Sequence, residues 1–417
     1  MYWLKIFNRA AAGLLTILLS SCTSFKAPKT LFITYQAAQR DFQVNREQIQ
    51  SVFDKYTKAF QRSNPDTRIV YITYTSSEFF NQIEQDSRLN LGPDLVMMNQ
   101  YSAAELLARD LTVTLPNKPY FDEIYSPRIQ LSAKANDEYT FAPWLLDIQI
   151  ACYNKTTIKE APNTIQELEE LSASGIKFGI SSDPYELIWT AGTQGAISEI
   201  SAVGNRTTTD DSTYPAIQKW LKWLRKAAIY QHIYFLGDSV DLTKKLKNNE
   251  LDWVTCWGTQ LEDLKKTMGD KIGVAALPNS STSRAFPTYA VYGFALGKNS
   301  SQSQREMAIK FVKTSVNTVA QRKLQLDDIG FLAANQNVAI PPESSKNLSA
   351  IDTSFNDQNN YYSKEWPGVV RWLLPEENNL EKSWGRYIQL RGTLIELTDG
   401  YLNINEAIKR ITTTKES

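Results

Sequence analysis

The sequence predicts an α/β protein with two domains. Strand and helix patterns alternate along the N-terminal third, which is typical of parallel strands joined by right-handed crossovers. Later in the chain, three extended or irregular segments read as connections between two sheets. The chain has 417 residues, of which 42% are hydrophobic. Since a single core stops growing at about 250 to 300 residues, two cores are expected.

Strands are predicted over 31–35 and 68–74, with a helix over 44–60 whose apolar residues recur at helical spacing. Ser76 and Ser77 are predicted to cap the following helix. These elements form the first strand–helix alternation of the chain.

The stretch from Gly92 and Pro93 onward predicts a buried strand that delivers polar groups at its carboxyl end. The apolar run after Asp94 ends in Asn99, Gln100 and Tyr101, and a helix over 103–108 follows. Small ligands of open α/β sheets lie beyond such strand ends, so these three residues show where to look for a site. The alternative is an ordinary strand–helix unit.

Three connections between sheets are predicted after residue 138. Pro143 makes the extended run over 139–153 unsuitable as a central strand of one sheet, and indicates that this segment crosses from one sheet to the other. The strand over 288–296 is the second crossing, and the polar run over 340–360 is the third connection, disordered over 344–360. The other predicted elements are, in order, a helix over 162–171, a strand over 177–181, a helix with Asp183 as N-cap and Pro184 at its first position, helices over 214–230 and 240–247, strands over 253–256 and 272–277, a helix over 306–326, a strand over 330–334, and helices over 376–397 and 404–411.

The charge balance argues against nucleic acid and anionic membrane surfaces as partners. Lys plus Arg number 45, as do Asp plus Glu, and no long block of like charge occurs. A surface that binds either partner needs such a block. The composition is that of a globular protein.

The N-terminus predicts export and a lipid anchor. Lys5 and Arg9 precede an apolar run over 10–19 that is too short to span a bilayer, and Leu-Ser-Ser-Cys ends at Cys22. This ending resembles the lipobox of bacterial lipoproteins, in which the cysteine is acylated and becomes the first mature residue. We therefore predict a signal peptide over 1–21, and a lipidated cysteine with its tether over 22–30. The alternative is a cytoplasmic protein with an apolar N-terminal helix.

The remaining cysteines and the one histidine offer little chemistry. Cys152 and Cys256 lie in strand-like surroundings, where buried free thiols are the default. A disulfide between them is the alternative, because an exported protein meets an oxidising compartment. His232 is the only histidine and no CxxC pair occurs, so a zinc site or a serine triad lacks its usual groups and no cofactor is expected.

Together these pieces resemble the extracellular solute-binding proteins of ABC importers, in the branch that includes the maltose/maltodextrin-binding protein. The motifs that carry the resemblance are the lipobox, Gly92-Pro93-Asp94-Leu95-Val96, Pro143 before a strand ending in Tyr153-Asn154-Lys155, Asp183-Pro184-Tyr185, and the Gly293 strand followed by the helix around Met307 to Val312. They cover essentially the whole mature chain.

The resemblance implies a periplasmic-binding-protein fold of type II, with two α/β lobes joined by three hinges and a solute held between them. Lobe one would be 31–146 plus 290–337, and lobe two 147–289 plus 338–417. The protein would be a monomer that serves an ABC permease and its ATPase, anchored on the periplasmic side of the inner membrane or on the outer face of the cell membrane. The physical requirement is a closed state that the solute stabilises.

The resemblance also implies a set of pocket residues. They are Gln36, Asn99, Gln100, Tyr101, Asp147, Asp183, Tyr185, Trp189, Trp257, Tyr289, Tyr292 and Trp384, with Tyr387 as the alternative to Trp384. Core packing is the alternative for each ring, and a plain helix cap is the alternative for Asp183. No catalytic residue is expected.

These residue types suit a sugar, glycoside or polyol, because rings pack on the apolar face of a pyranose and carboxylates accept its hydroxyl protons. Met98 stands where the maltodextrin branch has a tryptophan, which weakens the expectation of maltodextrin itself. The alternatives are a glycerol phosphoester or polyamine as solute, a sensor subunit for a membrane receptor, and an exported carbohydrate-active enzyme with Asp147 and Asp183 as its carboxylate pair.

Overall fold

The computed structural model describes residues 29–37, 53–75, 78–209, 213–230, 232–326, 330–340, 345–374 and 380–413. The predicted signal peptide, Cys22, most of the tether, the first part of the 44–60 helix, and the predicted caps Ser76 and Ser77 lie outside these ranges. Within the described ranges, no helix has the length and apolar character needed to cross a membrane.

The elements up to the first crossing are β1 (Lys29–Ala37), a helix over 53–63, β2 (Thr67–Thr75), α3 (Phe79–Arg88), β3 (Leu95–Asn99), α4 (Gln100–Ala108), β4 (Thr112–Val113), α5 (Lys118–Ile124), α6 (Pro127–Ala133), β5 (Lys134–Ala135), β6 (Glu138–Tyr139) and β7 (Ala142–Asn154). The middle of the chain forms α7 (Ile165–Ala173), β8 (Phe178–Ser181), α8 (Pro184–Leu187), α9 (Trp189–Thr193), α10 (Ile197–Gly204), α11 (Pro215–Ala227), β9 (Ile233–Leu236), α12 (Ser239–Lys247), β10 (Trp253–Trp257), η1 (Gly258–Gln260), α13 (Leu261–Met268), η2 (Gly269–Lys271) and β11 (Ile272–Ala275). The remainder forms β12 (Tyr289–Gly297), α14 (Gln302–Val316), α15 (Thr318–Leu326), β13 (Leu332–Ala333), α16 (Lys346–Asp352), the π-helix η3 (Thr353–Asn359), η4 (Asn360–Tyr362), α17 (Trp366–Leu373), α18 (Leu380–Thr398) and α19 (Ile404–Thr412).

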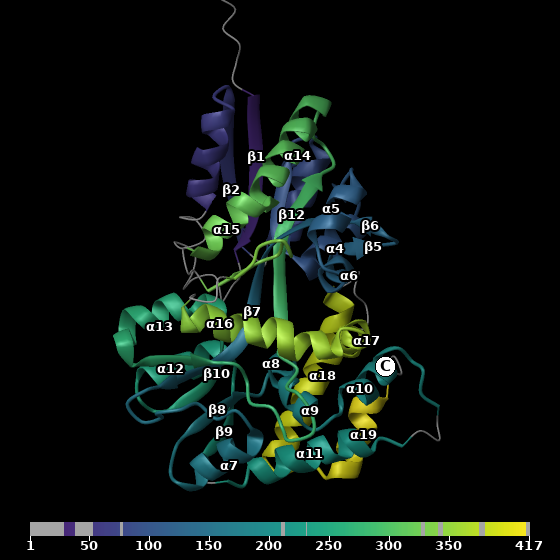
Figure 1. The fold of residues 1–417 in the computed structure, drawn as a ribbon. Helices are drawn as coiled ribbons and strands as arrows, with labels where there is room; N and C mark the ends of the chain where they lie inside the picture. Colours follow the sequence, from purple (N-terminus) through teal and green to yellow (C-terminus); the bar gives the residue numbers. More distant parts are fainter. Residues whose placement is uncertain are drawn as a thin grey trace, which may run out of the picture.

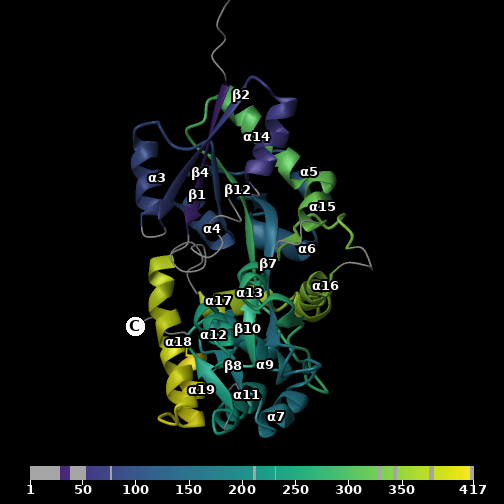
Figure 2. The ribbon, with the colours of Figure 1, turned by 90° about the vertical axis from the view of Figure 1, so that its left-hand side faces the viewer.

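These elements build two α/β lobes (Figure 1), which confirms the predicted fold class. One lobe holds β1 to β6 with α3 to α6, α14 and α15, and the other holds β8 to β11 with α7 to α13 and α16 to α19. Figure 2 shows α18 upright along one side of the second lobe, with its upper end toward the first lobe.

Two long strands connect the lobes. The strand order is β2-β1-β3-β12-β7-β10-β8-β9. The first half of β7 pairs antiparallel with β12, from Ala142 to Ile148, and its second half pairs with β10 from Gln149 to Tyr153. One continuous strand therefore belongs to both lobes, and Figure 1 shows β7 and β12 running from one lobe to the other.

β7 confirms the predicted crossing over 139–153, and Pro143 lies near the start of this strand, where it pairs with Gly293 of β12. The register between β12 and β7 shifts between Tyr292 and Gly293, which pair with Leu145 and Pro143, so Trp144 is skipped. A bulge of this kind interrupts the ladder where proline cannot donate a hydrogen bond. Trp144 itself is fully buried and packs on Phe53 and Phe294, with ring centroids 5.2 Å away in each case.

The Gly-Pro-Asp motif holds the first lobe together. Asp94 is 2% exposed, and its carboxylate accepts hydrogen bonds from Phe32 N (2.8 Å) and Ser300 Oγ (2.7 Å). A Cβ atom at Gly297 would lie 1.7 Å from the carbonyl oxygen of Pro93, so the chain here needs glycine. The motif thus joins β1 to the start of β3 and the end of β12.

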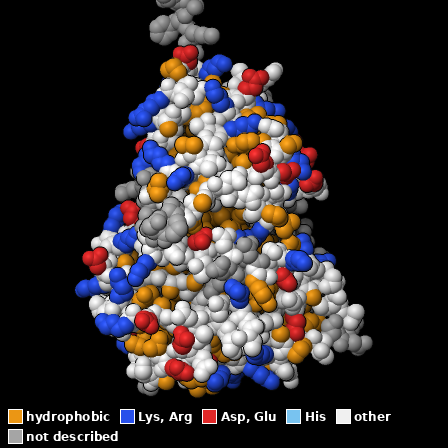
Figure 3. Space-filling view, in the orientation of Figure 1, with side chains coloured by type: hydrophobic (Ala, Val, Ile, Leu, Met, Phe, Trp, Pro, Cys, Tyr) orange, Lys and Arg blue, Asp and Glu red, His pale blue; other side chains and the backbone are white. Residues whose placement is uncertain are grey.

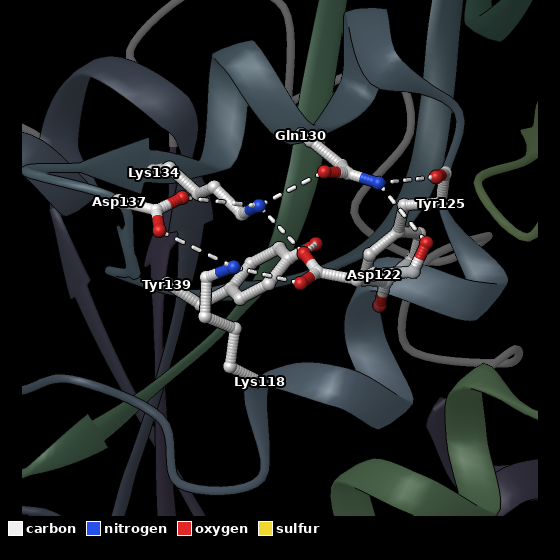
Figure 4. A network of polar contacts seen from close by, with 7 residues as sticks. All are labelled: Lys118, Asp122, Tyr125, Gln130, Lys134, Asp137 and Tyr139. Carbon is white, nitrogen blue, oxygen red and sulfur yellow. Dashed lines mark hydrogen bonds and ion pairs between the residues drawn. The ribbon is translucent and has the colours of Figure 1, made fainter.

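A polar network fixes the small β5–β6 hairpin on α5 and α6 (Figure 4). The Asp122 carboxylate meets Lys118 Nζ at 2.8 Å and Lys134 Nζ at 2.5 Å, and accepts a hydrogen bond from Tyr139 Oη at 3.0 Å. These contacts, with that of Lys118 the strongest, lower the pKa of Asp122 to about 2. Gln130 Nε2 donates to the carbonyls of Asp122 and Tyr125, so two short helices and a hairpin hold one another in place.

Three predictions about elements and cysteines are wrong. The predicted helix over 306–326 divides into α14 and α15 at Asn317, whose side chain accepts from Ala320 N (2.9 Å). The polar stretch predicted as disordered over 344–360 is helical from 346, because Leu348, Ile351 and Phe355 recur at helical spacing and are buried. The prediction missed α17 altogether.

The third wrong prediction is that Cys152 and Cys256 are buried free thiols. Cys152 and Cys256 form a disulfide between β7 and β10, with Cα atoms 5.9 Å apart. Val254 pairs with Cys152 and Cys256 with Ile150, so the two cysteines are diagonal neighbours on one face of the sheet. The alternative prediction, a disulfide formed in an oxidising compartment, is therefore confirmed.

Candidate functional site

Three aromatic rings lie together between the two lobes: Tyr101 from the first lobe, and Tyr185 and Trp257 from the second. We call these three residues the ring cluster. The Tyr185 ring is nearly parallel to that of Trp257 (centroids 6.2 Å apart, 8°) and edge-on to that of Tyr101 (6.3 Å, 83°). Tyr101 Oη lies 3.4 Å from Tyr185 Oη, which donates to the carbonyl of Tyr289 at 2.7 Å. All three rings are partly exposed. The surface is hollowed between the lobes, where hydrophobic side chains lie recessed (Figure 3).

The end of β3 brings Tyr101 to the cluster. Asn99 is the N-cap of α4, and its Oδ1 accepts from the backbone N–H groups of Tyr101 and Ser102, both at 3.0 Å. Gln100 is 8% exposed, and its Oε1 accepts from Val291 N at 2.8 Å, which ties α4 to β12. Of the three residues predicted at this strand end, Tyr101 reaches the cluster, while Asn99 and Gln100 hold the helix that carries it.

Asp183 is both a helix cap and a neighbour of the cluster. Its Oδ1 accepts from the backbone N–H of Tyr185 at 3.0 Å, which confirms the predicted N-cap of α8. The same oxygen accepts a hydrogen bond from Tyr387 Oη of α18. Burial raises the pKa of Asp183. Trp384, one turn before Tyr387, is 57% exposed, so Tyr387 is the residue of α18 that contacts the predicted pocket motif.

The hinge residues predicted for the pocket mostly contact other residues of the protein. Asp147 is 5% exposed and accepts from Thr259 Oγ1 (2.7 Å) and Thr259 N (3.2 Å). Tyr289 is fully buried and stacks on Trp366 (4.4 Å, 23°), so it contributes its carbonyl to the cluster rather than its ring. Tyr292 is partly exposed and edge-on to Phe331. The side chain of Gln36 lies outside the described part of the chain.

Trp189 lies in the core of the second lobe and not at the ring cluster. Its side chain is fully buried and packs on Trp253, with ring centroids 6.3 Å apart. The prediction assumed one continuous helix from Tyr185, which would put Trp189 on the same face one turn later. Instead α8 ends at Leu187, and a separate helix begins at Trp189.

Sequence reasoning missed Glu186, whose carboxylate is hydrogen-bonded to the indole ring of Trp257. Its Oε1 accepts from Trp257 Nε1 (2.9 Å) and Ser239 Oγ (2.8 Å), and its Oε2 accepts from Ser239 N (2.9 Å). Burial raises the pKa of Glu186 to about 7, and the charge of Asp183 adds to the shift. An acidic residue in the first turn of a helix is unremarkable as sequence, and its partners are 53 and 71 residues away, so no local signal could have found it.

A direct backbone contact lies beside the cluster, between Gly258 of η1 and Gly330 ahead of β13. A Cβ atom at Gly330 would lie 2.0 Å from the carbonyl oxygen of Gly258, and one at Gly258 would lie 2.0 Å from that of Gly330. Gly330 also has a φ of +80°. Because Gly258 follows Trp257 in the chain, this contact helps to set the end of β10.

Gly330→Ala is therefore expected to lower the free energy of unfolding by about 2 to 4 kcal/mol, through overpacking and left-handed strain together. Gly175→Ala is the matched control, because Gly175 has a φ of +103° in the turn that ends α7 but nothing within 4 Å of its Cβ position. The control should lose only about 1 kcal/mol. Urea denaturation measures both variants, and equal losses would show that the contact with Gly258 has no energetic role.

Residues 55–351 match the family of bacterial extracellular solute-binding proteins, and the chain belongs to that family. This confirms the resemblance found in the sequence, and the family is one of exported binding proteins rather than of enzymes. No curated protein sequence matches the chain.

Several solved structures share the fold. A cyclo/maltodextrin-binding protein complexed with maltotetraose is 13% identical, with a TM-score of 0.68 over 94% of this chain and 100% of that one. The GacH receptor of Streptomyces glaucescens, solved unliganded and with acarbose, is 14% identical, with a TM-score of 0.65 over 92% and 97%. MalE of Listeria monocytogenes in complex with maltose is 16% identical, with a TM-score of 0.64 over 92% and 97%. At such identities the likeness shows the fold alone.

Proposed function

We propose that this chain is the substrate-binding lipoprotein of an ABC importer, which captures a small carbohydrate between its lobes and delivers it to the permease. The observation that carries this proposal is the ring cluster, in which Tyr101 of one lobe meets Tyr185 and Trp257 of the other. A ligand held by both walls would stabilise the closed arrangement of the lobes, as a carrier requires.

The chemistry of the cluster supports a carbohydrate. Partly exposed rings offer flat apolar faces for the C–H face of a pyranose. The hydroxyls of Tyr101 and Tyr185 lie 3.4 Å apart, and the Asp183 carboxylate accepts from the backbone N–H of Tyr185, so donors and acceptors of the kind that sugar hydroxyls need are close to the rings. Solved proteins of this fold hold maltotetraose and maltose. We keep Tyr292 and Gln36 in the proposed site and take Tyr387 in place of Trp384, because Tyr387 contacts Asp183. Asn99, Gln100, Asp147 and Tyr289 are its supports.

The division into lobes at 146/147, 289/290 and 337/338 is part of the proposal. The exchange of partners along β7 near Ile148 and Gln149 supports the first of these boundaries. Lipid anchoring at Cys22 is supported by the sequence alone, through the short apolar run and the Leu-Ser-Ser-Cys ending. The carrier would act as a monomer at the outer face of the membrane.

A thermal-melting panel tests the proposal. We expect a neutral sugar, glycoside or polyol to raise the melting temperature, since a ligand at 100 times its Kd adds about 2.7 kcal/mol to the stability of the folded state. Trp257→Ala should abolish that rise. Tyr401→Ala is the control, because Tyr401 is 85% exposed and takes no part in the ring cluster. The panel also includes a glycerol phosphoester and a polyamine, and a rise with either of these alone would overturn the proposal.

A further inference from the structure

We infer that Glu186 is a positioning residue, whose carboxylate holds the indole ring of Trp257 in the orientation that the proposed carbohydrate site uses. The inference rests on the proposed function, because it assigns a role to Trp257 in that site. Glu186 itself is 9% exposed and does not belong to the ring cluster.

Trp257 is held at both of its nitrogen atoms. Its ring Nε1–H donates to Glu186 Oε1 at 2.9 Å, and its backbone N–H donates to Gln260 Oε1 at 2.9 Å. An indole has a single polar atom, so anchoring Nε1 fixes the rotation of the ring about its side-chain bonds. The ring then presents one face parallel to Tyr185, within 8°.

The carboxylate is itself held by the surrounding elements. Ser239, the first residue of α12, donates to it through its backbone N–H and its hydroxyl. The amino end of a helix favours a negative charge, which suits a carboxylate at this position. From β7, Gln149 Nε2 donates to the Glu186 carbonyl at 2.6 Å, and Gln149 Oε1 accepts from Thr288 N at 3.3 Å. Glu186 thus connects α8, α12, β7 and β10.

Two adjacent residues determine how the parallel rings of Tyr185 and Trp257 are held. Tyr185 and Glu186 are consecutive in a helix of four residues, so the same short segment carries one ring and anchors the other. A ring that is already fixed costs less conformational entropy when a ligand binds. Loss of the carboxylate should free Trp257 while leaving the Asp183 cap on Tyr185 N in place.

The first test needs no ligand. The emission of Trp257 is obtained as the difference between each protein and its Trp257→Phe counterpart, and its quenching by acrylamide is measured. Glu186→Ala should make Trp257 clearly more quenchable, and Glu186→Gln, which keeps an acceptor oxygen for Nε1, should restore part of the protection. If Glu186→Ala leaves the quenching of Trp257 unchanged, the inference is wrong.

Glu199→Ala is the matched control. The Glu199 carboxylate accepts from Ala216 N (3.0 Å) and Ile217 N (2.8 Å) at the start of α11 in the same lobe, so it has the same kind of helix-end role as Glu186 without the contact to Trp257. It should lower the melting temperature and leave Trp257 quenching unchanged. Equal changes in quenching for Glu186→Ala and Glu199→Ala would mean that Glu186 acts only on general stability.

The second test uses maltose as the probe in titration calorimetry. Glu186→Ala should weaken binding by about tenfold, Glu186→Gln by less, and Glu199→Ala should leave it unchanged. In the Trp257→Phe background, Glu186→Ala should have no further effect, and an equal loss there would overturn the inference. If maltose and the other carbohydrates of the panel do not bind at all, the proposed function fails, and the quenching of Trp257 still decides the role of Glu186.

Discussion

Reduction of the Cys152–Cys256 disulfide is expected to lower the free energy of unfolding by about 4 to 5 kcal/mol. The bond joins residues separated by 104 positions, and closing a loop of about 100 residues removes about this much entropy from the unfolded chain. Both cysteines are fully buried, so the folded state should change little when the bond is opened. Urea denaturation with and without dithiothreitol measures the difference.

The double variant Cys152→Ala/Cys256→Ala is the control for this prediction. It should be less stable than the oxidised protein by a similar amount and should not respond to dithiothreitol. A midpoint of the native chain that stays the same under reducing conditions would contradict the prediction, provided that thiol titration shows the bond to be open.

Trp189→Ala is expected to lower the stability of the ligand-free protein by about 3 to 5 kcal/mol, as for other large buried side chains replaced by alanine. Trp189 is fully buried against Trp253, whereas Trp257 is partly exposed at the ring cluster. Trp257→Ala should therefore cost clearly less in the absence of sugar. Urea denaturation without ligand gives both values.

The same pair of variants separates core packing from ligand binding. Trp189→Ala should keep the rise in melting temperature with the active sugar, although it starts from a lower temperature, and Trp257→Ala should lose that rise. The reverse pattern would show that the ring at position 189, and not the one at 257, contacts the ligand. Similar losses of apo stability would place both rings in the core.

Much of the fold could be predicted because its signals are local. The run from Leu95 to Met98 is buried throughout, as a strand covered on both faces should be. In α11 the apolar residues Ile217, Trp220, Leu221 and Leu224 recur at helical spacing, and all are fully buried. The N-cap of α8 could likewise be predicted from the sequence, because Asp followed by Pro is typical of the start of a helix.

The candidate site was harder to predict because it depends on contacts between distant residues. Tyr185 follows β8 and Trp257 ends β10, and these two strands pair side by side, while the pairing of β10 with β7 brings Cys256 next to Cys152. Helical spacing from Tyr185 failed for Trp189, since α8 ends at Leu187 and a separate helix begins at Trp189. Glu186 was missed because its role depends on where Ser239 and Trp257 lie in space.

The most direct measurement of the central claim is a crystal structure with the sugar that raises the melting temperature. We expect the sugar to lie between the lobes and to contact Tyr101 of α4 and Trp257 of β10 at once. A sugar that contacts one lobe only, or that lies away from both of these rings, would contradict the account.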